Sequence, residues 1–142
     1  MNLQFAREQY RRHSQPDATV PDDAHAIIAL VMEELQGALQ RLCIASENQA
    51  ALPTDAMVKS MSALYILQSS LDMDSDTEIA VPLFQVYEYC RQQVMAAFRK
   101  EEGHAEGLGK ARDFIASLKE AWGQMDKTAF AAKPAPAAAP AP

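Results

Sequence analysis

The sequence predicts an all-α protein, folded as an antiparallel up-down four-helix bundle with a short N-terminal helical segment. Apolar residues recur at alternating steps of three and four along four long stretches, which is the spacing of one helix face. Glycine is scarce, at five residues, and no stretch shows the alternating pattern typical of strands. Because short breaks join the helical stretches, neighbouring helices should pack antiparallel.

Size and charge narrow the class of protein. A chain of 142 residues forms one domain whose core needs no metal or disulfide support. The formal net charge of −6 argues against binding nucleic acid through phosphates. No apolar run approaches the ~20 residues that span a bilayer, and the N-terminus lacks a signal-peptide core. We expect a cytosolic (cytoplasmic) protein without membrane insertion.

The N-terminal segment, residues 1–15, is weakly amphipathic and carries Leu3, Phe5 and Tyr10. It is too short to be a stable helix alone in water, so it either docks on the bundle or frays. The bundle domain should occupy residues 22–127. Residues 131–142 contain only alanine, proline and one lysine, which predicts a disordered, extended tail.

The first long helix is expected from about Asp23 to Ser46, with Asp22 or Asp23 as its N-cap. Its two adjacent apolar stripes make an arc wider than one neighbouring helix would cover. The stripes are Ile27, Val31, Leu35, Ala38 and Leu42, and beside them Ile28, Met32, Leu39 and Cys43.

The second helix should begin at a cap on Thr54 or Asp55 and end near Asp72. The third should fall within 76–102 and either start late enough to place Pro82 in its first turn or kink there. The fourth should cover about 106–126. In each of these last two helices, the apolar residues that share one face form a seam. The seam of the third helix is Ile79, Leu83, Val86, Cys90, Val94 and Ala97, and that of the fourth is Leu108, Ala111, Ile115, Leu118, Trp122 and Met125.

Several large apolar residues lie off these seams and need a partner from this chain or another. Methionines on three helices either fill the core or line an adaptable groove for an amphipathic guest. The predicted partner-binding groove consists of Ile28, Met32, Val58, Met61, Tyr65, Phe84, Tyr87 and Met95.

No arrangement of residues predicts catalysis, a cofactor or a metal. Glu101 and His104 have the spacing of one di-iron ligand pair, but a second pair and two more carboxylates are missing. A solvated turn explains them better. Cys43 and Cys90 lie on apolar helical faces and are expected to be small buried hydrophobes.

The central stretch carries an ordered series of short motifs. They are Leu71-Asp72-Met73, Glu78-Ile79-Ala80, Leu83, Val86-Tyr87-Glu88-Tyr89 and Leu118-Lys119-Glu120-Ala121-Trp122. This series resembles the FliS family of flagellin-specific export chaperones, and the match covers about half of the chain. The sequence departs from the family where Asp76-Thr77 replaces a Gly-Gly pair.

The resemblance implies a non-catalytic cytosolic bundle that binds the disordered C-terminal segment of flagellin. Such a chaperone prevents premature polymerisation and delivers flagellin to the export gate of the flagellar type III apparatus. The resemblance also implies that the N-terminal segment, through Leu3, Phe5 and Tyr10, forms a lid over the groove. The alternative is a self-associating bundle whose extra apolar stripes bury a homodimer interface.

Overall fold

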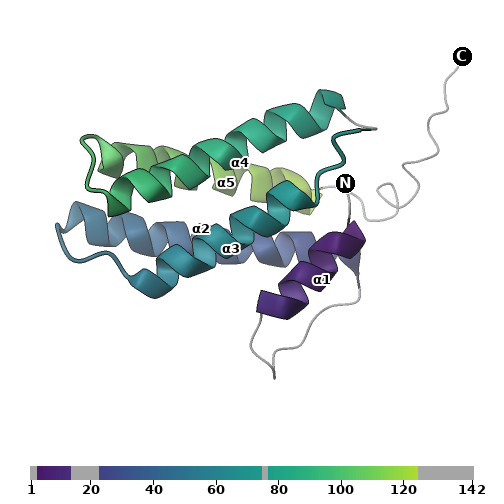
Figure 1. Ribbon diagram of the computed structural model, residues 1–142, viewed down its shortest axis with the longest axis horizontal. Coiled ribbons are helices and arrows are strands. Elements are labelled where there is room, and N and C mark those ends of the chain that lie inside the picture. The colour runs from purple at the N-terminus through teal and green to yellow at the C-terminus, as the bar shows by residue number, and fades with distance from the viewer. Residues whose placement is uncertain (1–2, 14–22, 75–76, 125–142) are drawn as a thin grey trace, which may run out of the picture.

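The computed structural model of the chain describes residues 3–13, 23–74 and 77–124 (Figure 1). In this part of the chain there are five helices and no strand, as the sequence predicts. The short first helix is α1 (Leu3–His13). The four long helices are α2 (Ala24–Glu47), α3 (Thr54–Ser69), α4 (Thr77–Phe98) and α5 (His104–Gln124).

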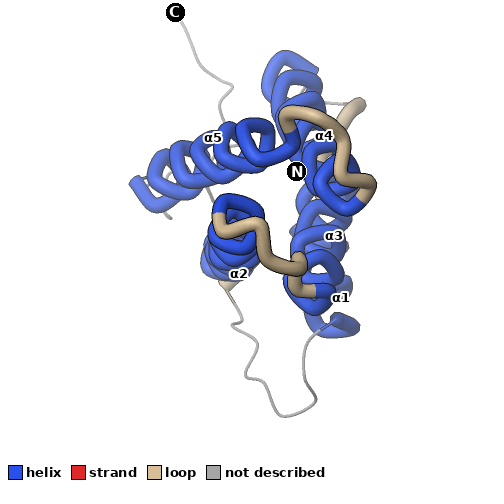
Figure 2. Tube along the Cα trace, turned by 90° about the vertical axis from the view of Figure 1, so that its left-hand side faces the viewer, coloured by secondary structure: helices blue, strands red, loops and turns tan. Residues whose placement is uncertain are grey.

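The long helices form a closed ring of neighbours. Helix α2 packs on α3 and α5, and α4 packs on the same two helices. Figure 2 looks along the bundle and shows the loops α2–α3 and α4–α5 at the same end. Helix α1 lies against α2 and α3, toward the other end of the bundle (Figure 1). This leaves α2 with three neighbours.

The wide apolar arc of α2 is confirmed. All nine residues of its two predicted stripes are buried, because α1, α3 and α5 each cover part of the helix. Asp23 is the N-cap, and its Oδ1 accepts a hydrogen bond from the backbone N–H of His25 at 3.0 Å. For α3 the cap residue is Pro53, without a side-chain cap, so the predicted cap at Thr54 or Asp55 is wrong.

Helix α4 begins earlier than the predicted late start. Pro82 lies in its second turn, where proline lacks the N–H that would bond to the carbonyl four residues back. A kink at this point stays a prediction. At the start of α4 the buried face also differs from the predicted one, because Ala80 is buried while Ile79 is exposed. Further along, Cys90, Val94 and Ala97 are buried as predicted.

Two helix ends are set by residues other than glycine. Gln49 after α2 and Lys100 after α4 have left-handed backbone, at φ 56° and 57°. Ala50 N–H bonds to the Ala45 carbonyl and Glu101 N–H to that of Ala96, the long bonds of Schellman motifs. Helix α4 therefore ends at Phe98 rather than near Glu102.

Helix α5 begins sooner than expected because Gly103, at φ 82°, makes the turn immediately before it. Gly107 lies inside the helix and is buried, and a Cβ there would meet the side chain of Gln93. Leu108, Ala111 and Ile115 fill the core as predicted.

A reciprocal contact closes the bundle at the start of α2 and the end of α5. The Trp122 indole N–H donates to the His25 carbonyl oxygen at 2.9 Å. His25 Nε2 donates in turn to the Trp122 carbonyl oxygen at 3.0 Å, and the rings stack at 4.7 Å. The predicted tail at 131–142 lies outside the described residues.

Candidate functional site

Helix α1 docks on the surface shared by α2 and α3. Its inner face buries Ala6, Gln9 and Tyr10. Phe5 packs edge-on against Tyr65 of α3, with ring centroids 6.4 Å apart, and the Tyr10 hydroxyl donates to Glu34 Oε2 of α2 at 2.9 Å. Docking is therefore the observed state of this segment, and its two aromatic residues tie it to different helices.

A pocket of about 330 Å³ lies beside α1, between α2 and α3. Its lining is mainly apolar, and charged groups stand at its edge. We call this the α2–α3 pocket; it is lined by Tyr10, Val31, Glu34, Asp55, Val58, Lys59, Ser62, Ala63 and Ile66. Because Tyr10 belongs to both, the docked helix and the pocket form one continuous surface.

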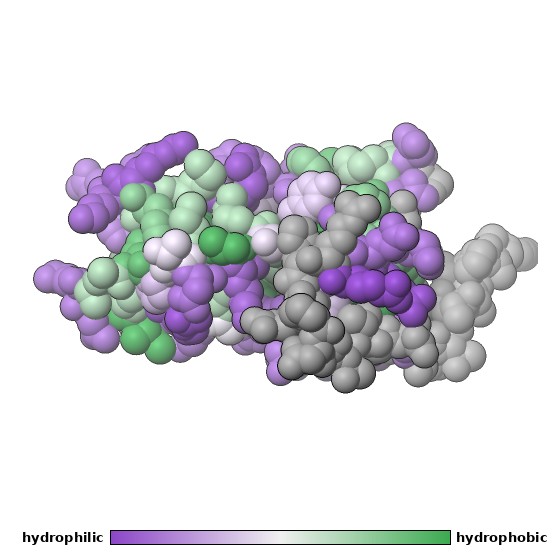
Figure 3. All heavy atoms as spheres, turned by 60° about the horizontal axis from the view of Figure 1, so that its bottom comes forward, coloured by the Kyte–Doolittle hydropathy of each residue, from purple (hydrophilic) through white to green (hydrophobic). Residues whose placement is uncertain are grey.

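The space-filling view looks onto the lower side of the bundle. Figure 3 shows apolar side chains gathered over the end where α2 and α3 are joined, among polar side chains. Val58 and Ile44 are among the exposed large apolar residues of these helices, at 59% and 48% exposure. Apolar surface thus continues beyond the part that α1 covers.

An ion pair spans α2 and α3 at one edge of the pocket. Arg41 donates to both carboxylate oxygens of Asp55, at 2.8 and 3.1 Å. These hydrogen bonds lower the pKa of Asp55 and raise that of Arg41. Both side chains are exposed, so the ion pair contributes little to stability. It nevertheless neutralises the negative charge of Asp55.

The structure corrects the placement of three predicted groove residues. Ile28, Met32 and Tyr87 are 0%, 3% and 0% exposed and belong to the hydrophobic core. Ile28 and Met32 are buried because three helices, α1, α3 and α5, pack on α2. Tyr87 lies on the inner face of α4 with Cys90 and Val94, so it is a core residue rather than a surplus one.

The remaining predicted residues lie on different surfaces. Val58 lines the α2–α3 pocket and Tyr65, one heptad later, contacts α1. Met61 is half-buried and lies one heptad before Gln68, which bonds to Glu88 of α4, so it lies on the α4 side of α3. Phe84 is exposed on α4, away from the pocket lining.

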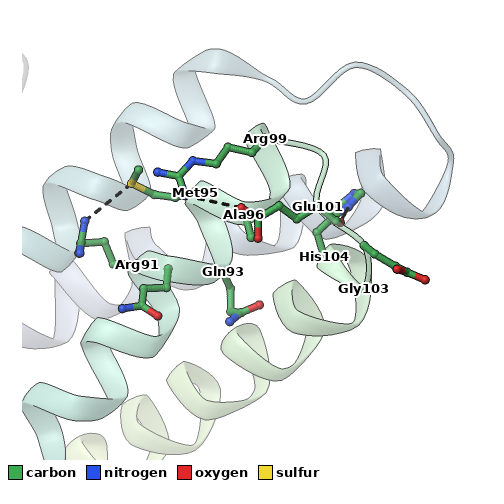
Figure 4. Close-up of a pocket in the computed structure, with 10 residues that line it drawn as sticks. Arg91, Gln93, Met95, Ala96, Arg99, Glu101, Gly103 and His104 are labelled. Carbon is green, nitrogen blue, oxygen red and sulfur yellow. Dashed lines mark hydrogen bonds and ion pairs between the residues drawn. The ribbon is translucent and has the colours of Figure 1, made fainter.

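Met95 lies in a second pocket, of about 380 Å³, at the turn between α4 and α5 (Figure 4). The lining there is polar, and Arg91 donates to the Met95 sulfur at 3.7 Å. His104 Nδ1 lies 2.8 Å from the Glu101 carbonyl oxygen, so this ring caps the turn. Within the described ranges, no cluster of three or more metal-ligating side chains occurs.

Both cysteines are buried, as predicted. Burial raises the pKa of Cys43 and raises that of Cys90 to about 12. The Cys90 thiol donates to the Ala111 carbonyl oxygen at 3.8 Å, which joins α4 to α5. Both thiols are thus protonated core groups at neutral pH.

Sequence reasoning missed Glu34 and Lys59 of the α2–α3 pocket. Glu34 belongs to an acidic pair that reads as a solvated helix face, yet it is half-buried and bonds to Tyr10. The usable signal is the spacing of Glu34 from Val31 and of Lys59 from Ala63, which puts each charge beside an apolar residue.

The family comparison matches most of the chain. A family model described as Flagellar protein FliS matches residues 6–129, from within α1 to beyond the end of α5. No curated protein and no solved structure matches the chain. None of the described helices is long and apolar enough to cross a membrane. Because the matched range covers well over half of the sequence, the chain belongs to the FliS family of flagellar export chaperones.

Proposed function

We propose that the protein is a cytosolic chaperone that binds the C-terminal segment of flagellin on the surface shared by α2 and α3. The observation that carries this proposal is the α2–α3 pocket, an apolar site next to the surface on which one helix, α1, is already docked. A surface that holds one amphipathic helix has the shape and polarity to hold another.

The docked α1 supports a lid role for residues 1–15, with Leu3, Phe5 and Tyr10 as its apolar contacts. A helix of this length is marginal on its own, so it should leave the surface at a small free-energy cost. A client segment would then compete with α1 for part of the site.

Binding of this kind suits a client that must later be released. A segment that folds on binding loses conformational freedom, which costs several kcal/mol of the gross interaction energy. While bound, the client's apolar face is covered and cannot assemble into filaments. We infer that the complex is then delivered to the export gate of the flagellar type III apparatus.

The bundle itself acts as a rigid, non-catalytic scaffold for this surface. We infer an antiparallel up-down order for α2 to α5, which the short connections at residues 48–53 and 99–103 favour. Residues 22–127 would then be the chaperone domain.

Co-purification tests the proposal. The full chain is mixed with full-length flagellin from the same genome and with flagellin lacking its last ~40 residues, a reach that suits a guest lying across several helices. Binding of the full-length form alone supports the proposal. Equal binding of both forms, or binding of neither, would overturn it.

A homodimer is the second candidate, and it rests on the start of α4. Ile79, Val81 and Phe84 are exposed there within two turns. If this surface joins two copies, Ile79→Ser together with Phe84→Ser should convert a dimer into a monomer in light scattering. A monomeric wild-type protein would remove this candidate.

A further inference from the structure

The α2–α3 pocket combines an apolar floor with a charged rim. Val31, Ala63 and Ile66 are buried and form the floor. Glu34 stands on the α2 side, while Asp55 and Lys59 stand on the α3 side. Since apolar floors give affinity and rim charges give selectivity, the state of each charge indicates which guest fits.

Among the residues that the structure describes, a cation pairs with one of the two rim carboxylates, Asp55. Asp55 holds both of its oxygens on the Arg41 guanidinium. Glu34 instead accepts the hydroxyl of Tyr10, a neutral donor. A cationic donor adds Coulomb attraction to the carboxylate that a neutral hydroxyl does not supply.

The donor on Glu34 belongs to the segment that is proposed to leave. When α1 is displaced, the Tyr10 hydroxyl goes with it, and Glu34, which is half-buried while α1 is docked, loses this donor beside an apolar floor. A guest that covers the carboxylate again without donating to it leaves a costly unsatisfied acceptor. A guest arginine or lysine would restore the hydrogen bond and add charge.

We propose that Glu34 is a specificity-determining residue that selects a guest helix carrying a basic side chain about one turn from its apolar anchor. The apolar side chain lies on the pocket floor, and the guanidinium or ammonium takes the place of the Tyr10 hydroxyl. Residues three or four apart share one helix side, so a single guest helix provides both. Lys59 repels the same cation from the α3 side and directs it toward α2.

This inference rests on the proposed function and is tested on the same client. The probe is a synthetic peptide of the last ~40 residues of flagellin from the same genome, in which each Arg and Lys is replaced by Gln in turn. Affinities are measured by calorimetry for the wild-type chain, for Glu34→Gln and for Glu33→Gln. Glu33 is an exposed neighbour on the same helix and serves as the matched control.

We expect one peptide replacement to weaken binding to the wild-type chain on the order of tenfold. The same replacement should cost less than about threefold with Glu34→Gln, and the full amount with Glu33→Gln. Higher salt should reduce the difference. Absence of coupling between Glu34 and every basic residue of the peptide, or a peptide that binds without any Arg or Lys, would overturn the inference. If the unmodified peptide does not bind at all, the proposed function fails instead.

Discussion

The Tyr87 hydroxyl is a buried polar group without a hydrogen-bond partner among the described residues. Its ring fills the core of the bundle, and burial raises its pKa well above the usual value. An unpaired buried hydroxyl costs free energy that a methine hydrogen in its place would not.

Tyr87→Phe should therefore leave the free energy of unfolding unchanged or raise it by about 1 kcal/mol. Tyr10→Phe is the matched control, because it removes a hydroxyl that does bond to Glu34, and it should lower stability by about 1 kcal/mol. Urea unfolding of the two variants gives both values. A loss of more than about 1 kcal/mol for Tyr87→Phe would mean that its hydroxyl has a partner.

Glu88 is held ionised by donors from two helices. Arg91 donates to both of its oxygens, Gln68 of α3 donates to one and Gln92 to the other. The Arg91 hydrogen bonds, and then that of Gln68, lower the pKa of Glu88 from 4.5 to about 2. The Glu88 side chain is half-buried, and solvent still screens part of its attraction to Arg91, so its contribution to stability is modest.

Because the folded pKa is the lower one, this contribution is present above pH 4.5 and is lost as the pH falls toward 2. Glu88→Gln should cost less than about 1 kcal/mol at pH 7, and the difference from wild type should shrink across that window. Thermal unfolding at a series of pH values measures it. A Glu88→Gln difference that stays constant between pH 7 and pH 2 would refute the account.

At the scale of the helix, the left-handed residues at the two Schellman ends are strained. Lys100 holds φ 57° without the freedom of glycine. Lys100→Gly should raise the free energy of unfolding by about 0.5–1 kcal/mol. Lys110→Gly, in the interior of α5, should lower it by about 1 kcal/mol. Chemical denaturation compares them, and a loss in both variants would show that Lys100 is not strained.

The helices themselves could be predicted because their apolar spacing is strong. The wide arc of α2 indicated more than one neighbour, and α1, α3 and α5 all pack on this helix. Helix ends were harder, because nothing in Gln49 or Lys100 signals left-handed backbone. On α4 the apolar residues are dense enough to fit two seams one residue apart, and packing selected the one that buries Ala80 and Tyr87.

For the whole molecule, the question is which apolar residues hold the bundle and which are free for a guest. Val58 and Tyr65 are exposed, as a groove residue must be, but the sequence assigned buried core residues to the same surface. The hydrogen bond between Glu34 and Tyr10 could not be predicted, since it depends on where a segment distant in sequence docks. To predict a site built from several helices, one must know how the helices pack as well as the spacing of apolar residues in each.

Core and surface should separate in their response to mutation. Val58→Ser together with Tyr65→Ser should abolish flagellin binding while changing the thermal midpoint little, because both side chains are about half exposed. Ile115→Ala should lower the free energy of unfolding by ~2–5 kcal/mol and spare binding below the midpoint. Calorimetry measures stability and co-purification measures binding. Loss of stability in the Val58 and Tyr65 variant, together with loss of binding in Ile115→Ala, would show that core and surface residues have been assigned the wrong way round.

Hydrogen exchange of the free chain and of its flagellin complex tests the central claim most directly, because it reports on α1 and on the α2–α3 pocket at once. We predict that flagellin slows exchange along residues 54–66 of α3 and speeds it along residues 3–13, as the client replaces α1. Unchanged exchange in both regions, with new protection confined to α4, would contradict the claim that the client binds on the surface shared by α2 and α3.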